Sequence, residues 1–251
     1  MGRTNLVLGG SANTRPAATF RASSVQRTSS IDDDAAVGHS AFLYLNRKVG
    51  KLIVEVDAVS GHGPASTAVQ TLRTRLESVV DKPGGTRFVF GRIASGHDSW
   101  TVDDLERAEK QSSRHHSDAD TMVMHVLYVD GTFADASDAV GATFSASSAA
   151  IFKQQAQSAS TPLVPPDAIE EAALVHEAGH LLSLVNIGYR SPRDHEDPQH
   201  RGHSSDRHSV MYWAIDRVDV VQLLGGSTRP STEFVDDDLA DLRDIRDGKL
   251  P

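Results

Sequence analysis

The sequence contains no cysteine in its 251 residues. Disulfides, thiolate-bound iron–sulfur clusters and thiol nucleophiles are therefore excluded, and any metal ion must be bound by His, Asp or Glu. Long apolar runs are also absent, because no stretch approaches the ~18 residues of a membrane-spanning helix. The N-terminal run Leu6–Leu8 is too short for the apolar core of a signal peptide, so no signal peptide is visible.

A surplus of basic residues is missing as well. The chain has 25 Lys and Arg residues against 34 Asp and Glu residues, which gives a formal net charge of −9. Nucleic acids and anionic membranes bind concentrated positive charge, so the composition argues against both as partners. A hydrophobic content of 39% with 24% charged residues is ordinary for a soluble globular protein.

The chain divides into two regions of different composition. Residues 1–38 are rich in Ser, Thr, Ala and Arg and lack periodic apolar positions, which predicts a largely disordered N-terminal arm. Residues 39–251 are predicted to form a single domain. Within that domain, the apolar patterns predict strands at 51–57, 87–93, 122–129, 140–144 and 149–152, and helices at 65–80, 102–113, 167–187 and 233–247. This order predicts a mixed sheet with helices packed on it.

The helix expected at 167–187 carries the clearest chemical signal. Asp167 is its expected N-cap, and Gly188 is the residue expected to end it. Inside the helix stands the motif HEAGH, residues 176–180. Residues four apart project from the same helix face, so His176 and His180 can bind one metal ion together. Zinc suits two imidazoles best, and Glu177 beside it can serve as general base and acid.

The same five-residue pattern also arises by chance in ordinary helices, where it has no catalytic role. Its surroundings favour the metal site here, because six of the 12 histidines lie between His176 and His208. A catalytic zinc ion of this type needs a third protein ligand. The long metzincin signature HExxHxxGxxH would place it at Asn186, and would place a glycine at Ser183. Asn is a poor zinc ligand, and Ser lacks glycine's freedom to let the helix turn sharply.

A second pattern downstream completes the signature. His203 precedes Met211 by eight residues, which resembles the spacing between the third zinc-binding histidine and the Met-turn methionine of metzincins. The spacing is close to that of archaemetzincins, whose two cysteines in this segment are replaced here by Ser204 and Ser209. The segment 195–203 also resembles prokaryotic proteins described as membrane metalloproteases. The chain is thus similar to a metzincin whose third ligand has moved 17 residues downstream of Asn186.

The resemblance implies a fold, a reaction and a site. The fold would be α+β and metzincin-like: a mixed, mainly parallel twisted sheet with an antiparallel edge strand, packed by a backing helix and an active-site helix, plus a C-terminal helix. The protein would be a zinc metalloprotease, an endopeptidase in which Glu177 assists attack by zinc-bound water. His176, His180 and His203 would bind zinc, residues 187–202 would form an insertion loop, and Met211 would lie beneath the metal in a Met-turn at about 209–213. An extended peptide or protein would be the substrate, and an exported or cell-envelope location is slightly favoured.

Several alternatives stay open. The third ligand could instead be His195 or Asn186, and less readily His200, Asp194, Asp197 or Glu196. A second ion could bind among His195, His200, His208 and Asp197, although a solvated polar loop is the simpler interpretation. The chain could also be an inactive zinc- or peptide-binding module with the same fold, or a zinc hydrolase of a non-peptide amide. Ser183, Asn186 and the missing cysteine pair are the features that depart from the family pattern.

Overall fold

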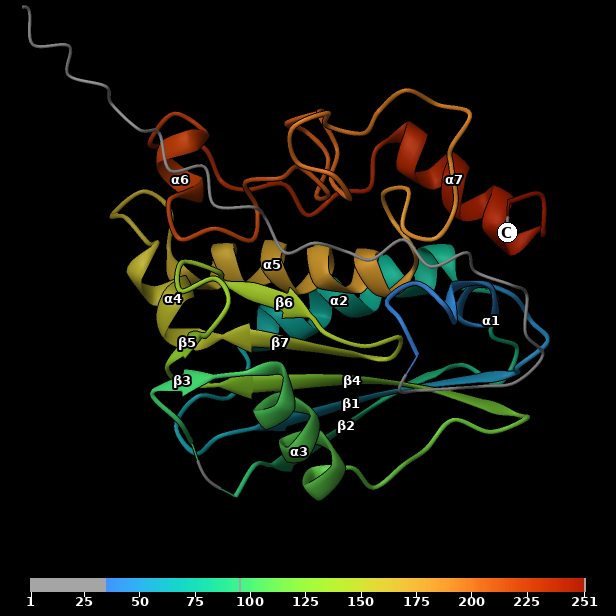
Figure 1. The fold of residues 1–251 in the computed structure, drawn as a ribbon, viewed down its shortest axis with the longest axis horizontal. Helices are drawn as coiled ribbons and strands as arrows, with labels where there is room; N and C mark the ends of the chain where they lie inside the picture. The colour runs from blue at the N-terminus through green and yellow to red at the C-terminus, as the bar shows by residue number, and fades with distance from the viewer. Residues whose placement is uncertain (1–34, 95, 251) are drawn as a thin grey trace, which may run out of the picture.

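A five-stranded sheet in the order β2-β1-β4-β7-β6 forms the centre of the protein (Figure 1). The computed structural model describes residues 35–94 and 96–250. The strands are β1 (Lys51–Ala58), β2 (Thr86–Arg92), β4 (Thr121–Val129), β6 (Gly141–Thr143) and β7 (Ser148–Phe152), and a separate pair is formed by β3 (Ser99–Trp100) and β5 (Thr132–Phe133). All neighbours in the large sheet are parallel except β6, which runs antiparallel to β7 at the edge. The expected mixed, mainly parallel sheet with an antiparallel edge strand is therefore confirmed.

Helices cover both faces of this sheet. They are α1 (Ala41–Leu45), α2 (Ser66–Val79), α3 (Val102–Ser112), α4 (Lys153–Ser158), α5 (Pro166–Leu181), α6 (Val220–Leu223) and α7 (Asp236–Arg246). In Figure 1, α2 and α5 lie on one face, α3 lies on the other, and the C-terminal segment with α6 and α7 lies over the outer side of α5. Helix α5 is thus enclosed by a layer on each side, which explains why nearly all of its residues are buried.

The central strands are apolar on both faces because both faces are covered. In β4, Met124 and Val126 belong to the core under α2 and α5, whereas Leu127 and Val129 belong to the smaller core under α3. Successive side chains of a strand point to opposite faces, and strands buried on both sides need apolar residues at every position. The near-continuous apolar run of β4 follows from this central place in the sheet.

The longer elements agree closely with the predicted ranges, and Thr101 with Asp104 forms the expected capping box of α3. The helix expected at 167–187 is corrected at both ends. Its N-cap is Pro165 rather than Asp167, and it ends at Leu181 because Ser183 and Asn186 adopt left-handed φ values of 76° and 58°. A right-handed helix cannot continue through such residues. Ser183 therefore makes the sharp turn for which the sequence analysis expects a glycine. Its hydroxyl donates a hydrogen bond to Ile187 O at 2.6 Å, which helps to hold this conformation.

The predicted N-terminal arm falls mostly outside the described residues, which begin at 35. Residues 35–38, which the prediction included in the arm, form hydrogen bonds with the rest of the chain. Ala146 N donates to Ala35 O at 2.8 Å, and the Ser183 hydroxyl donates to Gly38 O at 3.2 Å. In the described part of the chain, no helix combines the length and apolarity needed to cross a membrane.

Candidate metal centre

Three histidines from two separate segments meet above the C-terminal half of α5. His176 and His180 lie one helical turn apart, with ring centroids 4.6 Å from each other. His203 approaches from the C-terminal layer, and its ring lies 5.1 Å from that of His176 and 4.9 Å from that of His180. One nitrogen atom of each ring falls within 4.8 Å of the other two. The structure therefore gathers the three histidines that sequence spacing suggested as ligands.

The hydrogen bonds of these rings fix which nitrogen carries the proton. In each ring, Nδ1 lies within hydrogen-bonding distance of a backbone carbonyl, which can only accept. The three pairs are His176 with Val210 at 2.7 Å, His180 with Leu184 at 2.8 Å, and His203 with Arg201 at 3.2 Å. Each Nδ1 must therefore donate, so in the neutral rings Nε2 keeps a lone pair. A partner that fixes the tautomer and orientation of the ring is typical of metal-binding histidines.

The three Nε2 atoms point toward one another, and none of them carries a proton that could form a hydrogen bond between the rings. His176 Nε2 and His180 Nε2 are 3.0 Å apart, and His203 Nε2 is buried with no hydrogen-bond partner among the described residues. Burial and the neighbouring rings lower the pKa of His176 well below its usual value, and they lower the pKa of His180 to about 3. The rings of His176 and His180 are thus held neutral, as metal ligands must be. Three converging lone pairs in a cysteine-free site fit a zinc ion.

The inserted segment reaches the helix because it folds back on its own starting point. Val185 N donates to Gly202 O at 3.1 Å, so the chain returns to α5 one residue before His203. Glu196 stabilises this return, because its carboxylate accepts hydrogen bonds from Gly202 N at 3.1 Å and from the Asn186 amide at 3.1 Å. Burial opposes the charge on Glu196, but these hydrogen bonds outweigh it and lower the pKa below its usual value.

The turn around Met211 supports the other side of the site. Val210 supplies the carbonyl that orients His176, and Met211 O accepts a hydrogen bond from Ser204 N at 2.7 Å. The Met211 side chain packs beneath α5 at Gly179, where an added Cβ would lie 2.2 Å from Met211 Sδ. The turn therefore contacts both segments that supply histidines, and the glycine of HEAGH makes room for the methionine.

Glu177 lies beside the histidines and against the edge strand β6. Its Oε2 accepts a hydrogen bond from the Thr143 hydroxyl at 2.7 Å, and Gly141 leaves the space that the carboxylate occupies. Burial and the charge of Asp216 raise the pKa of Glu177 to about 8, although the hydrogen bond from Thr143 opposes this. A cation bound nearby would favour the carboxylate form again. The site thus combines three histidines with a carboxyl group whose charge depends on whether a cation is bound beside it.

Three residues of this site were not identified from the sequence: Gly141, Thr143 and Asp216. Gly141 and Thr143 lie on β6, more than 30 residues before Glu177, and nothing in their local pattern marks a catalytic contact. Asp216 follows the Met211 turn, and partial burial raises its pKa. The one available signal was the short run of small residues in an expected edge strand, which leaves room for a neighbouring side chain.

The alternative ligands are directed elsewhere. The Asn186 amide contacts Glu196 and Ser191 N, and both ring nitrogens of His195 face carboxylates of α7. The residues considered for a second ion lie in three separate groups: His195 with Asp238 and Asp241, His200 with Asp197, and His208 with Asp206. His200 also stacks on Trp213 with ring centroids 4.0 Å apart. A second ion remains a prediction from the sequence.

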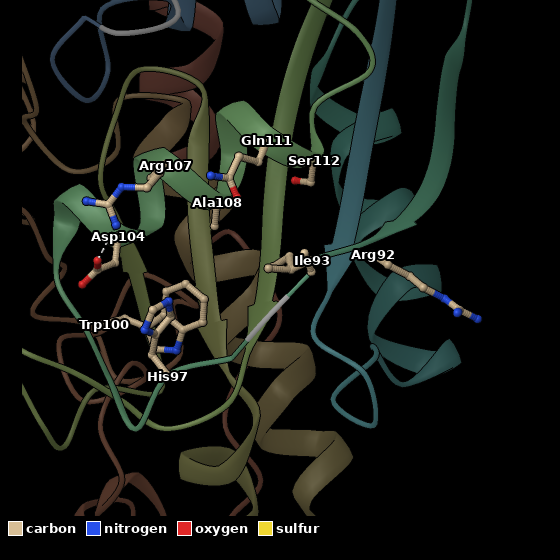
Figure 2. A pocket seen from close by; sticks show the side chains of 10 residues that line it. Arg92, Ile93, His97, Trp100, Asp104, Arg107, Ala108, Gln111 and Ser112 are labelled. Atoms are coloured by element: carbon tan, nitrogen blue, oxygen red, sulfur yellow. Dashed lines mark hydrogen bonds and ion pairs between the residues drawn. The ribbon is translucent and has the colours of Figure 1, made fainter.

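A cavity of about 240 Å³ lies on the opposite side of the sheet, between α3 and the end of β2 (Figure 2). Its cationic groups do not converge. Arg92 points away from the other lining side chains, and Arg107 is paired with Asp104 at 2.7 Å. His97 contacts Trp100 edge to face, with ring centroids 4.4 Å apart. These pairings indicate no second chemical centre in this cavity.

Comparison with known proteins identifies the fold but no close relative. No protein-family model matches the chain, and no curated protein does. Among solved structures, the crystal structure of archaemetzincin from Methanopyrus kandleri is similar, with a TM-score of 0.51 and 16% sequence identity. The similarity covers 78% of this chain and 96% of the archaemetzincin chain. At this identity the comparison shows a shared fold, in agreement with the family resemblance of the sequence motifs.

Proposed function

We propose that this protein is a zinc-dependent peptidase that cleaves peptide bonds within extended polypeptides. The observation that carries the proposal is the convergence of three unprotonated Nε2 atoms, those of His176, His180 and His203, beside Glu177. Bound zinc supplies a Lewis acid and makes water acidic enough to act as a nucleophile near neutral pH. The similarity to archaemetzincin supports the fold in which such a site is built.

Glu177 is the proposed general base and acid. Thr143 engages Oε2, which leaves Oε1 for proton exchange. Oε1 takes a proton from the attacking water and later delivers it to the leaving amine, which a carboxylate in a buried site does efficiently near neutral pH. Burial raises the pKa of Glu177, and the nearby carboxyl group of Asp216 raises it further, which strengthens Glu177 as a base.

The edge strand β6 is the proposed binding site for the substrate backbone. In the described sheet, β6 pairs with β7 on one side and is the last strand on the other. An extended peptide can add to such an edge through backbone hydrogen bonds. Thr143 lies on this strand and contacts Glu177, so a peptide bound along β6 would pass beside the acid–base group.

Metal analysis and one conservative variant test the proposal. The purified wild-type protein is expected to bind one zinc ion per chain and to cleave casein or a quenched fluorescent peptide library. Glu177→Gln should keep the zinc and lose activity by about 10²- to 10⁴-fold, the usual contribution of general acid–base catalysis. Glu171→Gln changes a partly exposed carboxylate on the same helix and should retain full activity.

The ligand set is tested separately. His203→Ala removes one of three expected ligands and should lower the zinc content well below one ion per chain. Full zinc content in this variant would contradict the assignment of His203. Zinc binding without activity on any peptide in the wild type would favour a binding module with this fold, and absence of zinc would contradict the proposed function as a whole.

A further inference from the structure

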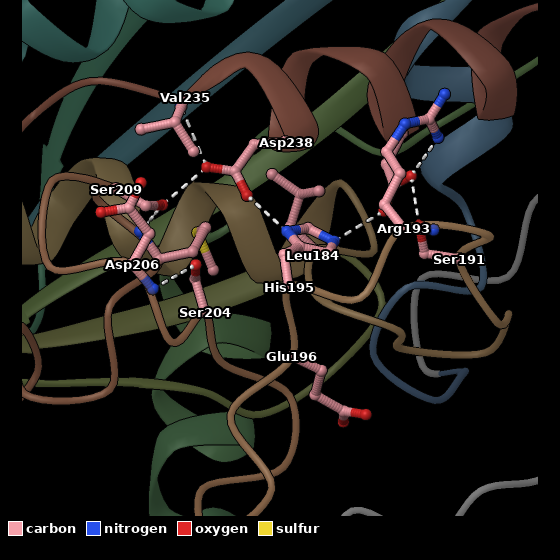
Figure 3. Close-up of polar contacts among 12 residues, drawn as sticks. Leu184, Ser191, Arg193, His195, Glu196, Ser204, Asp206, Ser209, Val235 and Asp238 are labelled. Carbon is pink, nitrogen blue, oxygen red and sulfur yellow. Dashed lines mark hydrogen bonds and ion pairs between the residues drawn. The ribbon is translucent and has the colours of Figure 1, made fainter.

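His195 lies buried between two carboxylates of α7, as Figure 3 shows for its contact with Asp238. Its Nδ1 is 3.4 Å from Asp238 Oδ1, and its Nε2 is 3.0 Å from Asp241 Oδ2. Both aspartates are fully buried. The Nε2 contact with Asp241 is a hydrogen bond, and the Nδ1 contact with Asp238 is an ion pair without a hydrogen bond. Ionised carboxylates can only accept, so between two charged aspartates both ring nitrogens carry protons and the ring is an imidazolium ion. This distinguishes His195 from His176, His180 and His203, whose Nε2 atoms are unprotonated.

The charges around His195 agree with this assignment. Burial opposes the positive charge, but the close contacts with Asp238 and Asp241 and the negative charges of both aspartates outweigh it and raise the pKa of His195 to about 9. The other groups at Asp241 are Arg193, Tyr189 and Ser191, which donate to its carboxylate, and Arg193 also pairs with Asp244. No further charged group contacts the His195 ring among the described residues.

The backbone of His195 is directly linked to the segment that carries His203. Ser205 N donates to His195 O at 2.9 Å, and Asp197 N donates to His203 O at 2.8 Å. Between these two hydrogen bonds, Glu196 and Ser204 form an antiparallel bridge. Residues 195–197 and 203–205 therefore form a small two-stranded ribbon, and the side chain of His195 fixes that ribbon to α7.

The same aspartate also holds the turn on the other side of the site. Asp238 Oδ2 accepts a hydrogen bond from the Ser209 hydroxyl at 2.6 Å, and Ser209 Oγ accepts from Met211 N at 2.8 Å (Figure 3). Met211 O in turn accepts from Ser204 N at 2.7 Å. Helix α7 thus binds both the ribbon that carries His203 and the turn that carries Met211.

We infer that protonated His195 is a positioning residue: bridging Asp238 and Asp241, it fixes the segment of His203 relative to His176 and His180. The segment has no cysteine to form a crosslink, and the buried ion triad takes that role. Buried ion pairs contribute little net stability compared with apolar packing, so their use here is better explained by the register they impose. The inference rests on the proposed zinc site, because its consequence is the geometry of the third ligand.

The charge of His195 can be measured in the wild-type protein without any substitution. Nitrogen-detected NMR titration of the zinc-free protein should show both His195 nitrogens protonated at pH 7 and a transition near pH 9. The folded pKa lies above the unfolded value of ~6.5. The stabilisation from His195 is therefore complete below pH 6.5 and is lost as pH rises through about 9. The melting temperature should fall over this range in the wild type, and less so in His195→Gln.

Zinc affinity tests the positioning role. His195→Gln should weaken zinc binding by about 10-fold, the lower end of the range for losing a direct outer partner of a metal ligand, because His195 acts on His203 through the backbone of the ribbon. His195→Lys keeps a positive charge between the aspartates and should recover much of this loss. A residue that merely fills space would give the opposite order, because lysine matches the imidazole shape less well than glutamine. His116→Gln, at an exposed histidine away from the site, is the matched control.

The outcomes separate the two proposals. Absence of zinc binding by the wild type contradicts the proposed function. Zinc binding by the wild type together with a His195 transition near pH 6.5 contradicts the ion triad alone. Equal zinc affinity of the wild type and His195→Gln also contradicts the positioning role, whereas a weakened His195→Gln with a recovered His195→Lys supports it.

Discussion

Glu177 can occupy its present place only because residue 141 is a glycine and has no Cβ. A Cβ at this position would lie 2.5 Å from Glu177 Oε1 and 2.8 Å from its Cγ, so the whole side chain would have to move. Gly141→Ala should therefore displace the general base while leaving the three histidines in place. We expect peptidase activity to fall by at least ~10-fold, since small misplacements of catalytic groups are costly. Zinc content should be unchanged, and both are measured on the same preparation.

Gly63→Ala is the matched control for this substitution. An added Cβ there meets no atom within 4 Å, so activity and stability should both be retained. If Gly141→Ala also keeps full activity, the position of Glu177 against β6 is not required for catalysis. If it loses zinc together with activity, the carboxylate and the ligand set are more closely coupled than their separate contacts indicate.

Ser183 shows how a single side chain can replace glycine at a sharp turn. Its φ of 76° is costly for a residue with a Cβ, but its buried hydroxyl shares its one proton between the carbonyls of Ile187, at 2.6 Å, and Gly38, at 3.2 Å. Ser183→Gly removes both the strain and the hydrogen bonds, so we expect a net change within about 1 kcal/mol in the free energy of unfolding. Ser183→Val keeps the strain, adds β-branching and loses the hydrogen bonds, and should cost about 2 to 4 kcal/mol.

Urea unfolding of the zinc-free protein measures both Ser183 variants against the wild type. Equal stability of Ser183→Val and Ser183→Gly would contradict this explanation of the turn. The sequence pattern alone suggested that serine would prevent the turn, because the familiar signature has glycine at this position. That interpretation was wrong because it considered the backbone preference of the residue and not the hydrogen bonds available to its hydroxyl.

At the scale of elements, Glu170 joins the start of α5 to two other helices. Its Oε1 accepts from Ala65 N, the N-cap of α2, at 2.7 Å, and its Oε2 pairs with Lys153 at the start of α4. Glu170 is fully buried. Glu170→Gln leaves the Lys153 ammonium without its partner, which should lower the free energy of unfolding by about 3 kcal/mol or more. Urea unfolding with Glu171→Gln as control tests this, and a loss no larger than that of the control would contradict it.

The longer elements could be predicted from the sequence because each contains its own signal. Helix α3 has a capping box, α2 has apolar residues at helical spacing, and β4 is apolar at nearly every position. The short helices α1, α4 and α6 have no such signal, since helices of four to six residues are stabilised by tertiary contacts rather than by their own sequence. The end of α5 was missed for a related reason, because its apolar periodicity continues beyond Leu181 while the backbone has already turned.

At the scale of the whole molecule, the site combines contributions from three layers. Helix α5 supplies two histidines and Glu177, the edge of the sheet supplies Thr143, and the C-terminal layer supplies His203. The contribution of α5 is local in sequence and could be read from one motif, and His203 could be inferred from its spacing to Met211. The contacts of Thr143, Asp238 and His195 depend on how the layers pack against one another, which no local pattern encodes.

A metal ion bound across two of these layers should stabilise the entire fold. A ligand that binds only the native state adds about 2.7 kcal/mol when its free concentration is 100-fold above Kd. For a domain of this size, each kcal/mol raises the melting temperature by roughly 2 to 4 °C, so zinc should raise it by roughly 5 to 11 °C. Scanning calorimetry of chelator-treated protein before and after zinc addition measures this shift. Mg²⁺, which prefers oxygen ligands, should have no such effect.

His203→Ala should lose most of the zinc shift, because its remaining histidines both lie on α5 and the ion would no longer connect the C-terminal layer to that helix. A full zinc shift in His203→Ala would show that the stabilising ion binds elsewhere.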